Sequence, residues 1–285
     1  MPETVIGAMD HLVLSIDRVR SPACVGLDPV LDRLPNELKQ LSPVDAIEQF
    51  CIGVIDAAMQ HVGVVKPQSA CFERYGSLGM RALERVCDHA NKHNLHIILD
   101  AKRGDIGISA AHYAAWAQEI GAHSITVNGY LGMETIEPYL DAGLGVFVLV
   151  RTSNPGSDAV QCSTLNDNRT VAQMMADQVS TLGASHMGTS GISDVGAVVG
   201  ATKSSEGADL RKHMPDTMFL VPGYGAQGGT IDDIRALVRL SGNPGVIVNA
   251  SRSVLYPKEP ESESWQDGVA TRAQHFAEEL RSLYR

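Results

Sequence analysis

Short apolar segments recur along the chain, and each of them ends in polar residues or glycine. Eight of these segments are about five to eight residues long and rich in Val, Ile and Leu. They cover residues 23–28, 63–68, 96–102, 124–128, 145–152, 195–201, 218–223 and 246–251. Such runs are typical of strands that are buried on both faces, as in a parallel sheet. The pattern therefore predicts eight parallel strands.

Helical patterns lie between these segments. The clearest follows Ser42 and Pro43, because serine is a favourable N-cap and proline is tolerated in the first helical turn. The apolar residues that then share one helix face are Ile47, Phe50, Cys51, Val54, Ile55 and Ala58. Further helices are predicted over 77–91, 109–120 and 270–284, whereas the polar stretches 153–168 and 202–216 are predicted to be loops.

The alternation of strands and helices predicts an α/β fold. Eight strands in alternation with helices favour a (β/α)8 TIM barrel, and no Pro- or Ser-rich linker divides residues 1–285, so we expect a single domain. A doubly wound sheet is the alternative, since strand order cannot be read from a sequence.

Composition narrows the class of protein. The net charge is −10 and the pI is about 5.4, which argues against a nucleic-acid partner, because such proteins usually carry a basic face. No apolar stretch approaches the roughly 18 residues that a membrane helix needs. The five cysteines form no C-x-x-C pair, which indicates reduced thiols. We therefore expect a cytoplasmic enzyme without a membrane partner.

Ionisable residues gather where the predicted strands end. Asp100 and Lys102 are two positions apart, so they share one face of the third strand. Asp105 lies just beyond them, and Lys66 ends the second strand. Because barrel enzymes carry their chemistry at the carboxyl ends of the strands, we expect these side chains to converge there. A purely structural ion pair is the competing interpretation, although buried ion pairs are poor stabilisers.

The segment that follows the seventh predicted strand is rich in glycine. Gly223, Gly225 and Gly228 form a G-x-G-x-x-G match between a strand and a helix, but no acidic residue ends the next strand, as a dinucleotide site would require. That strand leads instead to Arg252. Since the loops after strands seven and eight of barrels commonly bind phosphate, we expect a phosphate site. A glycine-rich turn beside a surface arginine is the alternative.

Two histidines have a spacing that could suit a metal site. His89 and His93 are four positions apart on a predicted helix, which places them on one face. No carboxylate accompanies them in this stretch as a metal-site partner, so we expect a solvated helix face.

Together these segments resemble the orotidine 5′-phosphate decarboxylase family over nearly the whole chain. Residues 100–107 read Asp-Ala-Lys-Arg-Gly-Asp-Ile-Gly, which is similar to the family's D-x-K-x-x-D-I signature in the form of one bacterial branch. The other matching segments are Gly26-Leu-Asp28-Pro, Val65-Lys66-Pro, the loop 222–229 and Asn249-Ala-Ser-Arg252. The D-x-K-x-x-D core is shared with related sugar-phosphate enzymes, so the combination carries the specificity.

This resemblance implies a reaction and a set of catalytic residues. The family converts orotidine 5′-phosphate into uridine 5′-phosphate and carbon dioxide, late in pyrimidine synthesis, and its members are homodimers that use no metal and no organic cofactor. The implied proton donor to C6 of the pyrimidine is Lys102. Lys66 and Asp100 complete the charged group with Asp105, which enters from the partner subunit in the family.

The resemblance also implies how the substrate is held. Asp28 and Lys66 would contact the ribose hydroxyls, and Ser109 would lie near the ribose. Ser153 would contact the pyrimidine amide, and Gln227 with Arg252 would hold the phosphate. The glycines at 223, 225 and 228 would form the phosphate loop. The long segment 154–168 departs from shorter family members.

Two alternatives stay open at this level. One is a Mg²⁺-dependent sugar-phosphate decarboxylase or aldolase of the same barrel superfamily. The other is a non-catalytic nucleotide-binding barrel, which would bind uridine 5′-phosphate without turnover.

Overall fold

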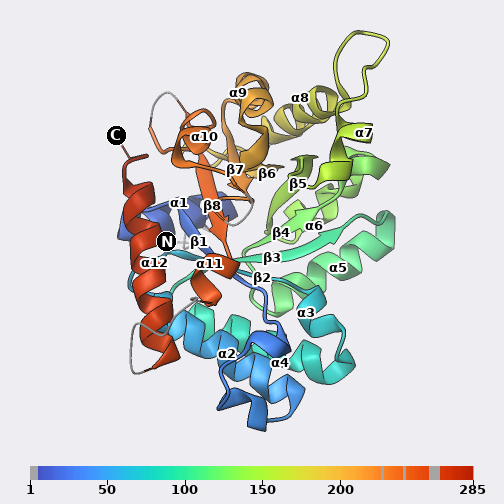
Figure 1. The fold of residues 1–285 in the computed structure, drawn as a ribbon. Coiled ribbons are helices and arrows are strands. Elements are labelled where there is room, and N and C mark those ends of the chain that lie inside the picture. The colour runs from blue at the N-terminus through green and yellow to red at the C-terminus, as the bar shows by residue number, and fades with distance from the viewer. Residues whose placement is uncertain (1–5, 226–227, 240–241, 257–263, 285) are drawn as a thin grey trace, which may run out of the picture.

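The computed structural model describes residues 6–225, 228–239, 242–256 and 264–284. Its strands are β1 (Ala23–Leu27), β2 (Val64–Pro67), β3 (His96–Arg103), β4 (Ser124–Val127), β5 (Gly145–Arg151), β6 (Ser193–Val199), β7 (Thr217–Val221) and β8 (Val246–Ala250). They are parallel, follow one another in chain order and close into a barrel in which β1 also pairs with β8 (Figure 1). Each predicted apolar segment overlaps one strand, so the barrel is confirmed and the doubly wound sheet is excluded.

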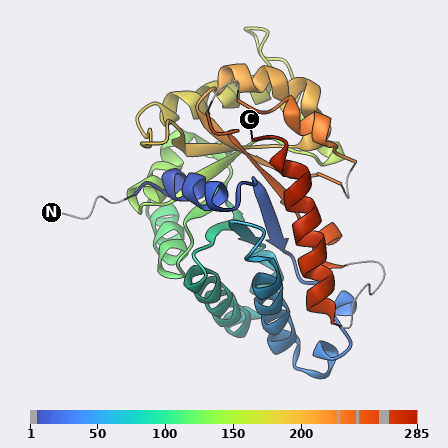
Figure 2. The same cartoon turned by 90° about the vertical axis from the view of Figure 1, so that its left-hand side faces the viewer.

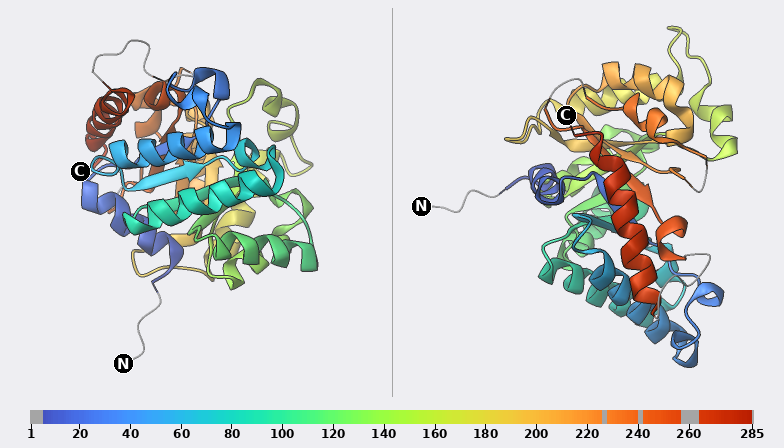
Figure 3. Two further views of the ribbon diagram at one scale, coloured as in Figure 1. Left: turned by 90° about the horizontal axis from the view of Figure 1, so that it is seen from below. Right: turned by 60° about the vertical axis from the view of Figure 1, so that its left-hand side comes forward.

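Helices connect the strands and surround the barrel, as the views from below and from the side show (Figure 3). They are α1 (Ala8–Val19), α2 (Pro43–Ala58), α3 (Ala70–Glu73), α4 (Gly76–Lys92), α5 (Gly107–Glu119), α6 (Glu137–Asp141), α7 (Asp158–Gln161), α8 (Val171–Gly183), α9 (Ser204–His213), α10 (Ile231–Arg235), α11 (Arg252–Leu255) and α12 (Trp265–Arg281). Within the described ranges, none of these helices is long and apolar enough to cross a lipid bilayer.

The predicted helices are confirmed as α2, α4, α5 and α12. The start of α2 is the predicted one, since the Ser42 side chain accepts a hydrogen bond from the Asp45 backbone N–H and Pro43 occupies the first turn. The predicted loop over 153–168 is wrong in part, because it contains α7 and a 3₁₀ turn at Pro155–Ser157.

The predicted loop over 202–216 is wrong, because it contains α9. This helix shows little apolar periodicity because an arginine makes much of its contact with the barrel. The buried Arg211 guanidinium lies 3.5 Å from the centroid of the Phe219 ring. Its N–H groups donate hydrogen bonds to the carbonyls of Met214, Thr217, Leu237 and Gly245. A buried cation that replaces an apolar stripe leaves no hydrophobic period to read.

Helix α1 closes the amino end of the barrel. Met9, Leu12 and Ile16 of this helix belong to one buried apolar cluster with Ile98 and Phe147 from the strands. Figure 2 shows α1 beside the start of β1. Among the described residues, the barrel interior is therefore filled by apolar side chains at this end, which leaves the carboxyl ends of the strands as the expected side for a ligand.

Side chains alternate along each strand, so every second residue faces the barrel interior as far as the open end. Val64 on β2 and Ile98 on β3 are part of the interior cluster. Because successive side chains point to opposite faces, Lys66 and Asp100, two positions further on, face the interior as well. Both side chains are buried. The inward row thus changes from apolar to charged as it reaches the mouth.

Candidate active site

A cavity of about 660 Å³ opens at the carboxyl ends of the strands. Strands β2 to β8 and the segments that follow β1, β5, β7 and β8 all contribute to its wall. The predicted site residues that line it are Asp28, Lys66, Asp100, Lys102, Ser153, Gly223 and Arg252. The cavity therefore brings together residues that lie more than two hundred positions apart in the sequence.

Asp100 is the centre of the charged group in this cavity. Its Oδ2 atom accepts a hydrogen bond from Lys66 Nζ at 2.7 Å and its Oδ1 atom accepts one from Lys102 Nζ at 2.5 Å. Thr126 Oγ1 donates to Oδ1 at 2.9 Å, and Gln68 Nε2 donates to Oδ2 at 3.1 Å. Each carboxylate oxygen thus has one ammonium partner and one neutral donor.

Burial and ion pairing shift the pKa values of Asp100 and Lys66 in opposite directions, and the effect of ion pairing is larger. Burial alone would raise the pKa of Asp100, but the ammonium groups of Lys66 and Lys102 hold it well below its usual range. Burial would likewise lower the pKa of Lys66, but the negative charges of Asp100 and Asp28 raise it above its usual value. Asp100 and Lys66 are therefore ionised at neutral pH, and Lys102 lies in the field of a permanent anion.

Lys102 reaches the cavity by a local irregularity of β3. The pairing of β3 with β4 shifts register between Leu99 and Arg103, and Lys102 has a φ of +46°, which is uncommon for a residue with a side chain. Thr126 Oγ1 holds this irregularity by accepting hydrogen bonds from the backbone N–H groups of Ala101 and Lys102, at 3.0 and 2.9 Å. The predicted convergence with Asp100 is correct, but regular strand alternation is not its cause.

Asp28 presents an unsatisfied acceptor to the cavity. It follows β1, and its Oδ1 atom is buried without a hydrogen-bond partner among the described residues. A buried carboxylate oxygen without a donor is costly, so such an atom in a cavity wall is a candidate contact for a ligand hydroxyl. The hydroxyl of Tyr256 accepts a hydrogen bond from the Val30 N–H at 2.8 Å and donates to the Asp28 carbonyl at 3.2 Å, which holds this corner of the cavity.

The loop after β5, which carries Ser153, is fastened by a buried arginine. The fully buried guanidinium of Arg151 pairs with Asp158 and Glu206, each at 2.6 Å, and donates to Ser157 Oγ at 2.8 Å. Ser153 and Ser157 line the cavity, so this group fixes one wall of it. We did not predict this role from the sequence, although a single charge at the end of an apolar strand was a visible signal.

The glycine-rich segment after β7 forms a closed turn. Gly223, Gly225 and Gly228 have φ values of 95°, 65° and 93°, which only glycine adopts readily. The Gly225 N–H donates to the Gly229 carbonyl at 3.0 Å, and the Gly229 N–H donates to the Gly223 carbonyl at 3.1 Å. Gly223 and the exposed Arg252 line the cavity. Gln227, the other predicted phosphate ligand, lies outside the described residues.

Besides Gly225 and Gly228, two of the predicted site residues that the structure describes do not line the cavity of this chain. Asp105 follows β3, and its carboxylate accepts a hydrogen bond from the Ile106 N–H at 2.8 Å. Ser109 lies in the first turns of α5 and is half-buried. Neither belongs to the cavity wall. The sequence-based expectation that Asp105 acts at the site of a partner subunit stays a prediction.

Comparison with known proteins assigns the family. Residues 21–266 match the model of the orotidine 5′-phosphate decarboxylase / HUMPS family. The chain belongs to this family. Relatives include the orotidine 5′-phosphate decarboxylases of Rhodopirellula baltica, 39% identical over 95% of this chain and 98% of that protein, and of Roseiflexus castenholzii, 41% identical over 84% of this chain and 85% of that protein.

Solved structures of the family agree with the fold. The structure of Leishmania donovani OMP decarboxylase has a TM-score of 0.79 and 28% sequence identity, with 98% of each chain covered. The resemblance drawn from the sequence is therefore confirmed for the family and for the barrel.

Proposed function

We propose that this chain decarboxylates orotidine 5′-phosphate to uridine 5′-phosphate and carbon dioxide, as a carboxy-lyase of pyrimidine nucleotide synthesis. The observation that carries the proposal is the Lys66–Asp100–Lys102 group at the mouth of the cavity, in which the buried Asp100 pairs with the buried Lys66 and with the more exposed Lys102. The family and the names of the relatives supply the substrate. The bond between C6 and the carboxylate breaks, CO₂ leaves, and C6 takes up a proton.

Lys102 is the proton donor in this proposal. Loss of CO₂ leaves an electron pair at C6 in an orbital that is not delocalised into the ring, so a fixed positive charge must stabilise it. The Lys102 ammonium is held in the cavity by Asp100 and carries the proton that C6 needs. It therefore stabilises the developing carbanion and then protonates it.

Asp100 has two consequences for the reaction. As a permanent anion it orients the Lys102 side chain through a hydrogen bond, which prepares the electrostatic field before the substrate binds. Its charge also repels the substrate carboxylate, and this repulsion disappears when neutral CO₂ forms. Lys66 offsets the burial cost of Asp100 from the opposite oxygen.

The remaining cavity residues bind the parts of the substrate that do not react. The unpartnered oxygen of Asp28, with Lys66, contacts the ribose hydroxyls. Ser153 contacts the pyrimidine amide from the β5 loop. Arg252 and the backbone around Gly223 hold the phosphate, together with Gln227. Binding energy from the remote phosphate lowers the barrier if it closes the glycine-rich loop over the site.

The hydrogen bonds that Asp100 accepts from two lysines favour this reaction over the Mg²⁺-dependent alternative. A magnesium ion on this carboxylate would have to displace Lys66 or Lys102, each of which already occupies one oxygen. We expect the purified enzyme to consume orotidine 5′-phosphate, followed by its ultraviolet absorbance, at an equal rate in excess EDTA. Loss of activity in EDTA that Mg²⁺ restores would favour the alternative. Binding of uridine 5′-phosphate without turnover would favour the non-catalytic barrel.

We further propose that the active enzyme is a homodimer in which Asp105 and Ser109 act at the partner's cavity. Beside Asp105, the side chains of Ile106 and Ile108 are 60% and 73% exposed. Tyr130, after the neighbouring strand β4, is 80% exposed. Apolar groups of this size, exposed next to a site residue that misses its own cavity, indicate a surface that a second copy covers.

Hybrid dimers test this arrangement. The variants Lys102→Ala and Asp105→Ala should each be nearly inactive alone, since each lacks one residue at every site. A mixed dimer has one site with both residues intact, so an equal mixture after subunit exchange should recover about a quarter of the wild-type rate. Dimers that exchange subunits but recover no activity would contradict donation of Asp105 across the interface.

We place the enzyme in the cytoplasm on the state of its thiols. All five cysteines are free, and Cys24, Cys51 and Cys87 are buried. Burial raises the pKa of Cys24 and of Cys87 to about 12, so these thiols are unreactive core residues. Free thiols suit a reducing compartment. Fractionation of the source cells, with activity found in the cytosolic fraction, would test this placement.

A further inference from the structure

A second group of potential ligands lies on the outside of the barrel, between α2 and α4. His89 lies in the last turn of α4, His93 directly follows that helix, and Asp56 on α2 faces both of them. We expected the two histidines to lie on a solvated face without a carboxylate partner. The expectation that no carboxylate accompanies them is wrong, because Asp56, 33 positions before His89, supplies one, whereas both histidine side chains are partly exposed to solvent.

The potential ligand atoms of this group all lie within 4.8 Å of one another. Asp56 Oδ1 lies 2.7 Å from His89 Nε2 and 3.6 Å from His93 Nε2. A tetrahedral metal ion that is about 2.0–2.1 Å from each ligand holds its ligand atoms about 3.3 Å apart. The two measured distances lie on either side of this value. Rotations of partly exposed side chains are therefore enough to admit an ion.

The orientation of the two imidazole rings also suits a shared ion. Their planes cross at 68° with centroids 4.8 Å apart. A ring nitrogen binds a metal through a lone pair in the plane of the ring, so crossed planes allow both lone pairs to meet. The side chains of His89, His93 and Asp56 are 25%, 31% and 50% exposed, which leaves room for water as the remaining ligand.

The scaffold that carries these ligands is already held together. Helices α2 and α4 lie side by side on the outside of the barrel (Figure 1). An ion pair between Arg85 of α4 and Glu48 of α2 joins them further along, with Arg85 Nε 2.6 Å from Glu48 Oε1. A metal at Asp56, His89 and His93 would therefore not have to bring two mobile elements together.

We propose that Asp56, His89 and His93 form a binding site for a divalent transition-metal ion of the Zn²⁺, Ni²⁺ or Cu²⁺ type. Two imidazoles and one carboxylate suit these ions better than Mg²⁺ or Ca²⁺, which prefer an all-oxygen shell. The ion ties α2 to α4 and stabilises the folded chain by binding it selectively. None of these residues lines the catalytic cavity, so the ion takes no part in decarboxylation.

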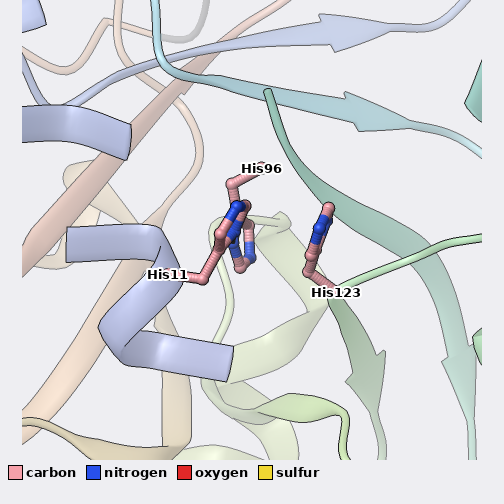
Figure 4. Close-up of side chains that lie close together, drawn as sticks. All are labelled: His11, His96 and His123. Carbon is pink, nitrogen blue, oxygen red and sulfur yellow. Dashed lines mark hydrogen bonds between the residues drawn. The ribbon is translucent and has the colours of Figure 1, made fainter. Parts of the chain in front are cut away.

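The other candidate metal site among the described residues is a cluster of His11, His96 and His123 at the amino end of the barrel (Figure 4). The rings of His11, His96 and His123 stack, with planes only 12° apart for His11 and His123, and nearly parallel planes direct their lone pairs past one another. Hydrogen bonds also occupy their nitrogens. His96 bonds to His11 at 3.1 Å and to Ser124 at 2.8 Å, and His123 accepts from the Ile97 N–H at 3.1 Å. This cluster is therefore a packing unit.

Calorimetric titration of the full-length enzyme with ZnCl₂, after removal of metals with EDTA, tests the proposal. We expect one equivalent to bind and the melting temperature to rise. The variants His89→Gln, His93→Gln and Asp56→Asn should each weaken binding by about tenfold or more and abolish the rise in melting temperature. His275→Gln, an exposed histidine of α12, is the matched control and should leave both unchanged.

Electron paramagnetic resonance of the Cu²⁺-loaded enzyme gives a second readout. Two imidazole ligands should produce hyperfine structure from two nitrogens, and either histidine variant should reduce it to one. Unchanged Zn²⁺ affinity in the His89→Gln/His93→Gln double variant would overturn the proposal. So would binding that is lost only in His11→Gln, or a Cu²⁺ spectrum with sulfur ligation. Decarboxylase activity should be equal in all these variants, so this test stands apart from that of the proposed function.

Discussion

The hydroxyl of Thr126 is predicted to control the rate of decarboxylation without touching the substrate's reacting bond. It accepts the N–H groups of Ala101 and Lys102 and donates to Asp100. Replacement of Thr126 by valine keeps the shape of the side chain and removes all three hydrogen bonds. The β3 irregularity that directs Lys102 into the cavity would then lose its support.

The size of the effect follows from these contacts. Thr126 is 1% exposed, so two backbone N–H groups lose their acceptor away from water, at about 1–3 kcal/mol each. Partial relaxation of the strand would leave a loss of about 2–4 kcal/mol in the free energy of unfolding. A displacement of the Lys102 ammonium by about 1 Å is enough to lower kcat about 100-fold. KM should change little, because Asp28 and Arg252 are untouched.

Steady-state assays of Thr126→Val and Thr126→Ser, combined with urea unfolding, check this reasoning. The serine variant keeps the hydroxyl and should retain most of the activity, whereas the valine variant should lose kcat at nearly constant KM. A folded Thr126→Val enzyme with wild-type kcat would refute the positioning role. Equal losses in both variants would show that the hydroxyl alone does not position Lys102, because the serine variant keeps it.

Three further predictions follow from the site and from the amino end of the barrel. Lys102→Ala should abolish measurable turnover with a native circular dichroism spectrum, and retained activity would contradict its role as proton donor. Arg252→Ala should lower kcat/KM by about 100- to 1,000-fold, since a charge-assisted phosphate contact is lost; an unchanged value would remove Arg252 from the phosphate site. Burial lowers the pKa of His123 to about 4 and that of His96 well below 6.5. The unfolded chain therefore binds more protons than the folded chain between about pH 4 and pH 6.5. The free energy of unfolding should be highest above about pH 6.5 and should fall as the pH drops toward 4, by about 3 kcal/mol from His123 alone. Urea midpoints across this range measure the effect, and a flat profile would contradict it.

The barrel could be predicted because local patterns determine most of it. Strands buried on both faces need unbroken apolar runs, and each of the eight runs overlaps a strand. The helix after Ser42 could also be predicted, because its N-cap and its apolar face depend on residues that are close together in the sequence. Helix α9 was missed because Arg211 reaches four carbonyls that come from several segments. No pattern within α9 itself records those partners.

The sequence by itself determined which residues could meet at the mouth, because the inward row of a parallel strand continues in steps of two as far as Lys66 and Asp100. Only the tertiary structure decided how Lys102 enters, since the shift of β3 against β4 depends on a hydroxyl from the neighbouring strand. The pairing of Asp56 with His89 was decided in the same way. Spacing along a chain fixes the face of one element, whereas contacts between elements depend on how they pack, and packing is a property of the whole fold.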